Sequence, residues 1–142
     1  MNVIEKVKQV LSNFSGISEL HIDFTGSTPE SFSLSSVGDM LLKTDILGNQ
    51  KRQHSFLFYA VFSSINDFER LSNSSALLNL TLWLENQKNI KIDNGKITKI
   101  FAENGMLYEI PDENKIIGYR YQMQIFAEYE LKKERKNEIN KL

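Results

Sequence analysis

One apolar stretch, Lys51 to Ser63 (KRQHSFLFYAVFS), constrains the fold of this chain most strongly. From Phe56 to Phe62, seven consecutive residues are apolar and four of them are aromatic. Such side chains favour a β-strand. Because the run does not alternate with polar residues, both faces of this strand are expected to need cover. At about 3.4 Å per residue the stretch would span roughly 44 Å, which is long for a chain of 142 residues.

The chain before this stretch predicts a helix followed by extended segments. Asn2 to Phe14 place apolar residues at helical spacing, and Asn2 can cap the helix. Leu20 to Phe24 and Ser31 to Leu34 alternate in polarity as short strands do. Met40 to Leu42 fit either a strand or a helical turn, and Leu47 to Asn49 predict a turn into the central stretch.

The segment after the central stretch predicts a helical region that reaches about Lys88 and has two apolar stripes. On one continuous helix, the first stripe consists of Ala76, Leu77, Leu80, Trp83 and Leu84, and the opposite stripe of Phe68, Leu71, Leu78 and Leu82. A surface helix normally has one apolar stripe, so two stripes predict two packing partners. A break at Asn73 to Ser75 would instead give two helices with one stripe each, and the pattern fits both alternatives.

The last third predicts an antiparallel meander. Asp93 to Lys96 predict a turn before a strand, and Asn104-Gly105 predict a tight hairpin that sets Glu103 opposite Met106. A further turn is expected at Pro111 to Lys115, followed by a half-exposed strand at Ile117 to Tyr129. The whole pattern predicts one α+β domain over residues 1–130 and a charged extension over residues 131–142. We expect a twisted antiparallel or mixed sheet with a long central strand, packed against the N-terminal and middle helices.

The composition excludes several classes of site. There is no cysteine, which rules out disulfides, thiolate catalysis and cysteine-ligated zinc. Seventeen basic and eighteen acidic residues give a net charge of −1, which argues against nucleic-acid binding as the main role. No segment approaches the ~18 apolar residues of a membrane-spanning helix, and the N-terminus lacks the apolar core of a signal peptide. A soluble protein that stays in its cell of origin is expected.

The pattern of polar residues predicts no catalytic, metal or cofactor site. His21 and Asp23 share one face of an expected strand and could in principle hold a metal, but they fit an exposed strand face better. His54 fits an ordinary strand residue. The serines lack a G-x-S-x-G motif, and the glycines lack the spacing of a phosphate-binding loop. We therefore expect a protein that is not an enzyme and binds no cofactor.

Two basic groups raise the question of nucleic acid. Lys51-Arg52 precede aromatic residues, an arrangement found on surfaces where bases stack. The second group, Lys132 to Lys136, is interspersed with glutamates and is typical of a solvated, mixed-charge surface. Neither pattern predicts sequence-specific recognition of nucleic acid.

Short groups of residues follow one another along most of the chain in a characteristic order. They are Asp23-Phe24 with Gly26, Pro29 to Leu34, Arg52 to Phe56, Trp83 to Gln87, Gly105 with Leu107-Tyr108, and Tyr121 to Ile125. In this order and spacing they resemble a family of small tail proteins of phages and defective prophages of Gram-positive bacteria, labelled minor capsid, tail completion or tail terminator proteins. The chain departs from the family pattern around Val37 to Leu42, where prolines are expected, and has a shorter connection between Gln87 and Gly95.

The resemblance implies an α+β subunit that assembles as a ring, with a hexamer expected, at the head-proximal end of a phage or phage-like tail. The ring would cap the tail tube and mediate head attachment without any chemistry. Implied partners are other copies of the chain, the tail tube protein, the tail sheath and a head-completion protein, with DNA passing through the lumen. No membrane partner is expected. The implied location is the tail of a virion or phage-like particle, assembled in the bacterial host cytoplasm.

Two surfaces are expected to make these contacts. Phe56 to Phe62 are expected to hold the centre of the sheet, with Lys51 to His54 projecting beyond it toward a neighbouring subunit or the tube. One stripe of the middle helix is expected to contact another subunit. The candidate interface residues are Lys51, Arg52, His54, Phe68, Leu71, Leu78 and Leu82. The alternative is a small non-catalytic ligand- or peptide-binding α+β module whose aromatic strand lines a pocket. A closed aromatic cavity would favour the module, whereas an open sheet with exposed Leu78 and Leu82 would favour assembly.

Overall fold

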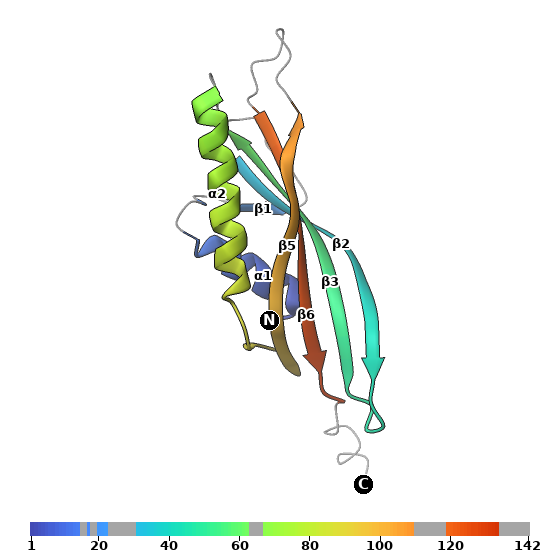
Figure 1. The fold of residues 1–142 in the computed structure, drawn as a ribbon. Helices are drawn as coiled ribbons and strands as arrows, with labels where there is room; N and C mark the ends of the chain where they lie inside the picture. The colour runs from blue at the N-terminus through green and yellow to red at the C-terminus, as the bar shows by residue number, and fades with distance from the viewer. Residues whose placement is uncertain (15–16, 18–19, 23–30, 63–66, 110–118, 134–142) are drawn as a thin grey trace.

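The structure is a computed structural model, and it describes residues 1–14, 17, 20–22, 31–62, 67–109 and 119–133. The described residues form α1 (Val3–Ser12), β1 (Leu20–Ile22), β2 (Ser31–Thr44), β3 (Gln50–Phe62), α2 (Asp67–Glu85), β4 (Ile90–Ile92), β5 (Gly95–Glu109) and β6 (Tyr119–Leu131). The strands make one sheet in the order β1-β2-β3-β6-β5-β4 (Figure 1). Only the β1–β2 pair is parallel. This confirms the α+β class.

The predicted central stretch forms β3, which lies between β2 and β6 along its whole length. Phe56, Phe58 and Ala60 point to one face and are buried in a single core that both helices share. Leu57 and Tyr59 point to the other face and are half-buried. Because both helices pack on the first face, neither covers the second, which we call the open face. Cover on both faces was expected, and the helices provide it on one.

The N-terminal helix α1 forms as its sequence predicts. The Asn2 side chain accepts a hydrogen bond from the backbone N–H of Glu5 at 2.9 Å, and the Glu5 carboxylate accepts one from the N–H of Asn2 at 3.1 Å. This reciprocal capping satisfies two backbone donors that a helix start leaves unpaired. The side chains that α1 buries against the sheet are Val3, Val7, Val10 and Leu11.

The middle helix α2 is continuous through Asn73 to Ser75, which decides between the two alternatives for this segment. It runs along one side of the sheet next to β5 (Figure 1). Its inner stripe buries Leu77, Leu80 and Leu84, whereas Ala76 is exposed and does not belong to the core. No helix in the described ranges is both long and apolar enough to cross a membrane.

The prediction of a hairpin at Asn104-Gly105 is wrong. These residues lie inside β5, which pairs with β6 both before them, at Glu103–Gln124, and after them, at Met106–Gln122. Three residue steps on β5 face two on β6, so Asn104-Gly105 accommodate a β-bulge rather than a chain reversal. The turn predicted at Pro111 to Lys115 lies outside the described residues.

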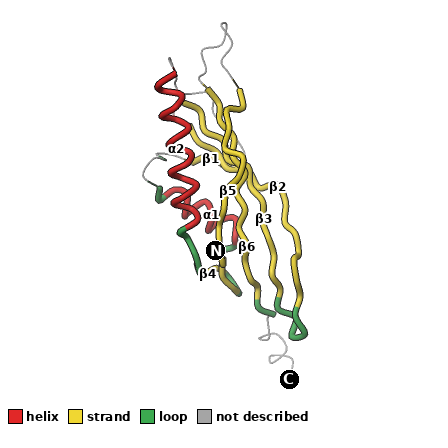
Figure 2. The backbone as a smooth tube through the Cα atoms, in the orientation of Figure 1, coloured by secondary structure: helices red, strands yellow, loops and turns green. Residues whose placement is uncertain are grey.

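The other predicted turns form, and they gather at one end of the sheet. Met40 to Leu42 are strand residues of β2, and the chain reverses after them with Gly48 at φ +89°. Only a residue that tolerates a left-handed backbone fits this position. The β4–β5 turn contains Asn94 at φ 60°. Figure 2 shows the β2–β3 turn and the end of β6 at the same end of the molecule.

Candidate functional site

The densest cluster of polar side chains in the described part of the chain joins β2, β3 and β6. Asp39 lies opposite His54, and Arg52 lies opposite Tyr129. The Asp39 carboxylate accepts hydrogen bonds from Arg52 Nε at 2.6 Å, from His54 Nδ1 at 2.9 Å and from the Tyr129 hydroxyl. On the far side of the imidazole, Ser36 Oγ lies 2.6 Å from His54 Nε2. We call these five residues the Asp39 cluster.

A β-bulge in β2 makes this cluster possible. Ser36 lies opposite Phe56 and Gly38 opposite Ser55, so one extra residue is inserted between them. The insertion turns Asp39 to the same face as His54, although strict alternation from Ser36 would point it to the opposite face. His54, which is 7% exposed, lies on the same face of β3 as Phe56 and Phe58, and the bulge brings Asp39 to that face.

The hydrogen-bonded order Ser36–His54–Asp39 is the same as in a Ser-His-Asp catalytic triad. A carboxylate only accepts hydrogen bonds, so His54 Nδ1 carries a proton, and Nε2 of the neutral ring can accept from Ser36. This geometry could activate a serine hydroxyl. However, Asp39 divides its lone pairs among three donors, one of them the permanently charged Arg52. A carboxylate already neutralised in this way supports an imidazolium ion less strongly.

The same contacts shift the pKa values of Asp39 and Tyr129. Burial raises the pKa of Asp39, but hydrogen bonds from Tyr129, Arg52 and His54 outweigh it, and the pKa lies below its ordinary value. Burial and the hydrogen bond to Asp39 raise the pKa of Tyr129 to about 12. At neutral pH the cluster therefore holds an ionised Asp39 and a neutral Tyr129, the state in which the carboxylate–phenol hydrogen bond forms.

The position of this cluster corrects the expectation that Lys51 to His54 project beyond the centre of the sheet toward a neighbouring subunit or the tube. Arg52 and His54 pair with β2 and β6 and bond to Asp39 of the same chain. Only Lys51 is exposed to solvent. The expectation was wrong because it treated the end of β3 as an overhang, whereas β2 and β6 are as long as β3 and flank it to its first residue.

The outer side of α2 presents two of the candidate interface residues. Leu78 is 57% exposed and Leu82 is 51% exposed, one turn apart on the helix. Phe68 and Leu71 belong to the same helix, and their side chains are outside the described part. The sequence therefore identified two exposed apolar side chains on the stripe opposite to Leu77, Leu80 and Leu84.

A second exposed apolar surface lies on the β2–β3 hairpin and was not identified from the sequence. Its residues are Val37, Met40, Leu41, Leu42, Ile46 and Leu47, and Ile46 is fully exposed. In the described residues β2 pairs with β1 only at Phe32 to Leu34, so from Ser35 to Thr44 its outer edge has no strand partner there. We call this surface the hairpin patch. Met40, Leu41 and Leu42 are visible in the sequence as an apolar run. Because they do not alternate with polar residues, the sequence did not indicate which side chains would be exposed.

The hollows that the described residues line do not resemble a buried ligand site. One hollow of about 40 Å³ lies between Phe14, Ile17, Phe32, Phe58 and α2, far below the roughly 300 Å³ of a small-molecule pocket. Two larger hollows are open, are lined mostly by charged and amide residues, and lie at the end of the sheet. Among the described residues, no three His, Asp or Glu side chains are grouped to hold a metal ion, and Asp23, the suggested partner of His21, lies outside them.

No protein-family model matches the chain, and no curated protein matches it with significant similarity.

Proposed function

We propose that this chain is a structural subunit that assembles with copies of itself into a ring at the head-proximal end of a phage or phage-like tail tube. The ring caps the tube and provides the surface for head attachment. The proposal rests on the resemblance of the sequence to tail completion and tail terminator proteins, and on the apolar surfaces that a lone subunit leaves in water. It requires no catalysis and no cofactor.

The observation that carries the proposal is the exposure of Leu78 and Leu82 on α2. The opposite side of the same helix buries Leu77, Leu80 and Leu84, and these three residues already pack α2 into the core. Two further leucines at helical spacing then form an apolar stripe that faces solvent. Such a stripe is typical of a surface that another molecule covers.

The hairpin patch supplies a second and different surface. A closed ring needs heterologous contacts, in which each subunit presents one surface to its neighbour on one side and another surface to its neighbour on the other. α2 lies along one side of the sheet, and the β2–β3 hairpin extends past the helices at the far end (Figure 1). Two separate apolar surfaces on one subunit are what this geometry requires.

The alternative function, a small ligand- or peptide-binding module, has less support. Its aromatic strand would have to line a pocket, yet Phe56 and Phe58 are 1% exposed and pack in the core. The hollow that Phe58 does line is too small for a ligand larger than water. The exposed Leu78 and Leu82 are the outcome expected for an assembly subunit.

The test replaces Leu78 and Leu82, singly, by aspartate in the full chain. Assembly buries these positions, and an unpaired carboxylate in an apolar contact costs several kcal/mol, so association with tail tubes from the same gene cluster should weaken on the order of 100-fold or more. Electron microscopy of tubes mixed with the protein checks for a terminal ring. The isolated variants should stay folded, with circular dichroism and urea unfolding close to the wild type.

Asn79→Asp provides the matched control, because Asn79 is an exposed neighbour on the same helix and receives the same charge. It should assemble normally if it lies outside the contact. Failure of the wild-type protein to associate with its tubes would refute the function. If Leu78→Asp or Leu82→Asp unfolds the subunit, the two residues belong to the core and the argument from α2 fails.

A further inference from the structure

A row of charged residues crosses the sheet close to the β2–β3 turn. At this level each residue lies directly opposite the next, strand by strand, in the order Lys43, Lys51, Glu130, Lys96 and Lys91. Directly opposed residues project from the same face of a sheet, and here it is the open face, since Lys51 alternates with Arg52 on the helix-covered side. We call these five residues the basic row.

The basic row concentrates positive charge on a protein that is almost neutral overall. Four strand separations of about 4.8 Å give it a length of roughly 19 Å. All five side chains are exposed, and their net charge is +3 from four lysines and one glutamate. Two of the four contacts along the row, Lys43–Lys51 and Lys91–Lys96, oppose like charges, which destabilises a sheet.

The described part of the chain does not neutralise this charge. None of the four lysines forms an ion pair with a described residue, although other lysines do, such as Lys99 with Glu128 at 2.8 Å. Glu130 alone lies within the row, between Lys51 and Lys96. The repulsion is thus left for a ligand of opposite charge to relieve.

The backbone beneath the basic row is held in place by the turns at this end of the sheet. The Lys133 N–H donates to the Asn49 side chain at 2.9 Å, and the Lys132 N–H donates to the Asn94 carbonyl at 2.7 Å. These bonds tie the end of β6 to the turns on both sides of it. At Gly95 a Cβ would lie 1.7 Å from the Glu130 carbonyl oxygen, so glycine permits the close approach of β5 to β6.

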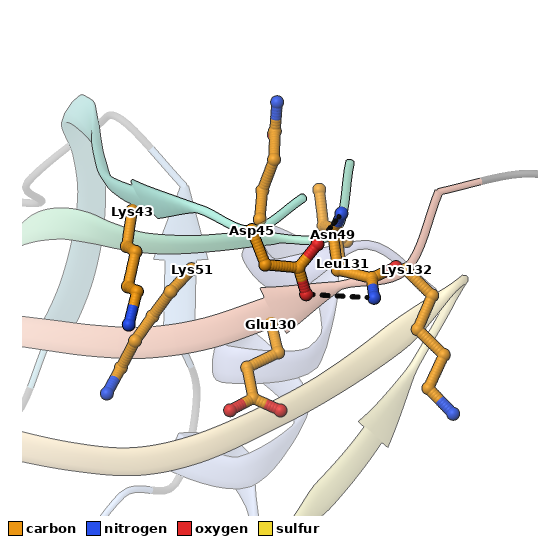
Figure 3. Close-up of a pocket in the computed structure, with 8 residues that line it drawn as sticks. Lys43, Asp45, Asn49, Lys51, Glu130, Leu131 and Lys132 are labelled. Carbon is orange, nitrogen blue, oxygen red and sulfur yellow. Dashed lines mark hydrogen bonds between the residues drawn. The ribbon is translucent and has the colours of Figure 1, made fainter. Parts of the chain in front are cut away.

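The surface around the row is hollowed and accessible. Open hollows of about 410 Å³ and 550 Å³ lie on the two sides of Glu130 and Lys132 and include all four lysines of the row between them. Figure 3 shows Lys43, Lys51 and Glu130 of the first hollow projecting to the same side, so their charged ends can meet one extended ligand.

We infer that the basic row binds the phosphate backbone of DNA without sequence preference. A lysine ammonium is a point charge suited to phosphate oxygens, and two pairs of lysines, one on each side of Glu130, can contact several phosphates of a polymer that repeats a single negative charge. An acidic protein fits less well, because protein interfaces are built around an apolar centre and every member of the row is charged. This inference does not depend on ring assembly, since each subunit carries the whole row.

The inference is tested by titrating a labelled DNA duplex of arbitrary sequence with the full chain and following fluorescence anisotropy. Three to four phosphate contacts predict a slope of about −2.7 to −3.6 for log K against log salt. Binding should therefore weaken about 40- to 150-fold between roughly 50 and 200 mM salt. The double variant Lys51→Gln/Lys96→Gln should reduce the magnitude of the slope by about 1.8, and Glu130→Gln should tighten binding.

Lys8→Gln/Lys88→Gln is the matched control, because it removes the same charge from exposed lysines outside the row. It should leave the salt slope unchanged. The inference is overturned if the wild type does not bind the duplex at low salt, or if the control loses as much affinity as the row variant. It is also overturned if polyglutamate competes as well as DNA per unit of charge, since the row would then be a surface for an acidic protein.

The test of DNA binding is independent of the test of ring assembly. Association with tail tubes is measured without DNA and depends on Leu78 and Leu82, whereas duplex binding is measured without tubes and depends on lysines of the open face. Loss of either property with retention of the other identifies which of the two proposals has failed.

Discussion

At the scale of single residues, Asp39 joins three strands. Three donors from β3 and β6 converge on one carboxylate, and this fixes the register of β2 against β3 beyond the point where the hydrophobic core ends. Hydrogen bonds to a charged group contribute about 1.5–3 kcal/mol each. In the half of the sheet that the core does not reach, the Asp39 cluster therefore sets which residues of β2 and β3 lie opposite each other. In the other half, apolar packing sets this register.

Tyr129→Phe should reveal this contribution through its pH dependence. Folding raises the pKa of Tyr129 from 10.0 to about 12. The contribution of the neutral phenol to the free energy of unfolding is therefore complete below pH 10 and is lost as the pH rises through 12. The variant should be less stable by about 1–2 kcal/mol near neutral pH. Urea unfolding of both proteins at several pH values should show the difference narrowing above pH 10. A difference that stays constant through the alkaline range would contradict the prediction.

Ser36 should not act as a nucleophile despite its contact with His54. Asp39 is already engaged by Arg52 and Tyr129, and the hollows described above are lined by other residues. A fluorophosphonate probe should leave Ser36 unlabelled, and Ser36→Ala should not change the background hydrolysis of an activated ester. Stoichiometric labelling that disappears in Ser36→Ala would instead establish a reactive serine.

At the scale of elements, the hairpin patch makes a prediction of its own. Ile46→Asp/Leu47→Asp introduces two charges at exposed positions of the β2–β3 turn. The free energy of unfolding should change by no more than about 0.5 kcal/mol per site, whereas ring formation on the tube should be lost. Urea unfolding measures the first effect, and electron microscopy of protein mixed with tubes measures the second.

Thr44→Asp serves as the control for this prediction, because it adds a charge at another exposed position of the same hairpin. Rings that persist in the double variant would exclude the turn from the subunit contact. An unfolded double variant would show that Ile46 and Leu47 support the turn rather than an interface.

The elements also show what the sequence could and could not predict. The long strand β3, the capped helix α1 and the two-striped helix α2 follow from periodicity within one segment. Asn104-Gly105 were mistaken for a turn because the local signal is the same for a hairpin and for a bulge, and only pairing with β6 distinguishes them. The Asp39 cluster was missed for a similar reason, since the bulge after Ser36 changes the face to which Asp39 points.

At the scale of the whole molecule, the sheet separates three kinds of surface. One face carries the helices and the core, the open face carries the basic row, and the β2–β3 hairpin carries the hairpin patch. Apolar and charged regions therefore do not compete for the same area, and the sheet could hold a neighbouring subunit at its edge while its open face contacts DNA. The separate variants of Leu78, Ile46 and Lys51 test this division directly.

The edge of β2 from Ser35 to Thr44, which no described strand pairs with, also has a consequence for how the protein must be produced. An exposed strand edge flanked by apolar side chains can add strands indiscriminately, which leads to aggregation. The residues proposed to drive assembly are then the ones that limit solubility. A cell that makes this subunit in excess of its binding sites would accumulate precipitate, so its synthesis has to be matched in amount and time to the structure that receives it.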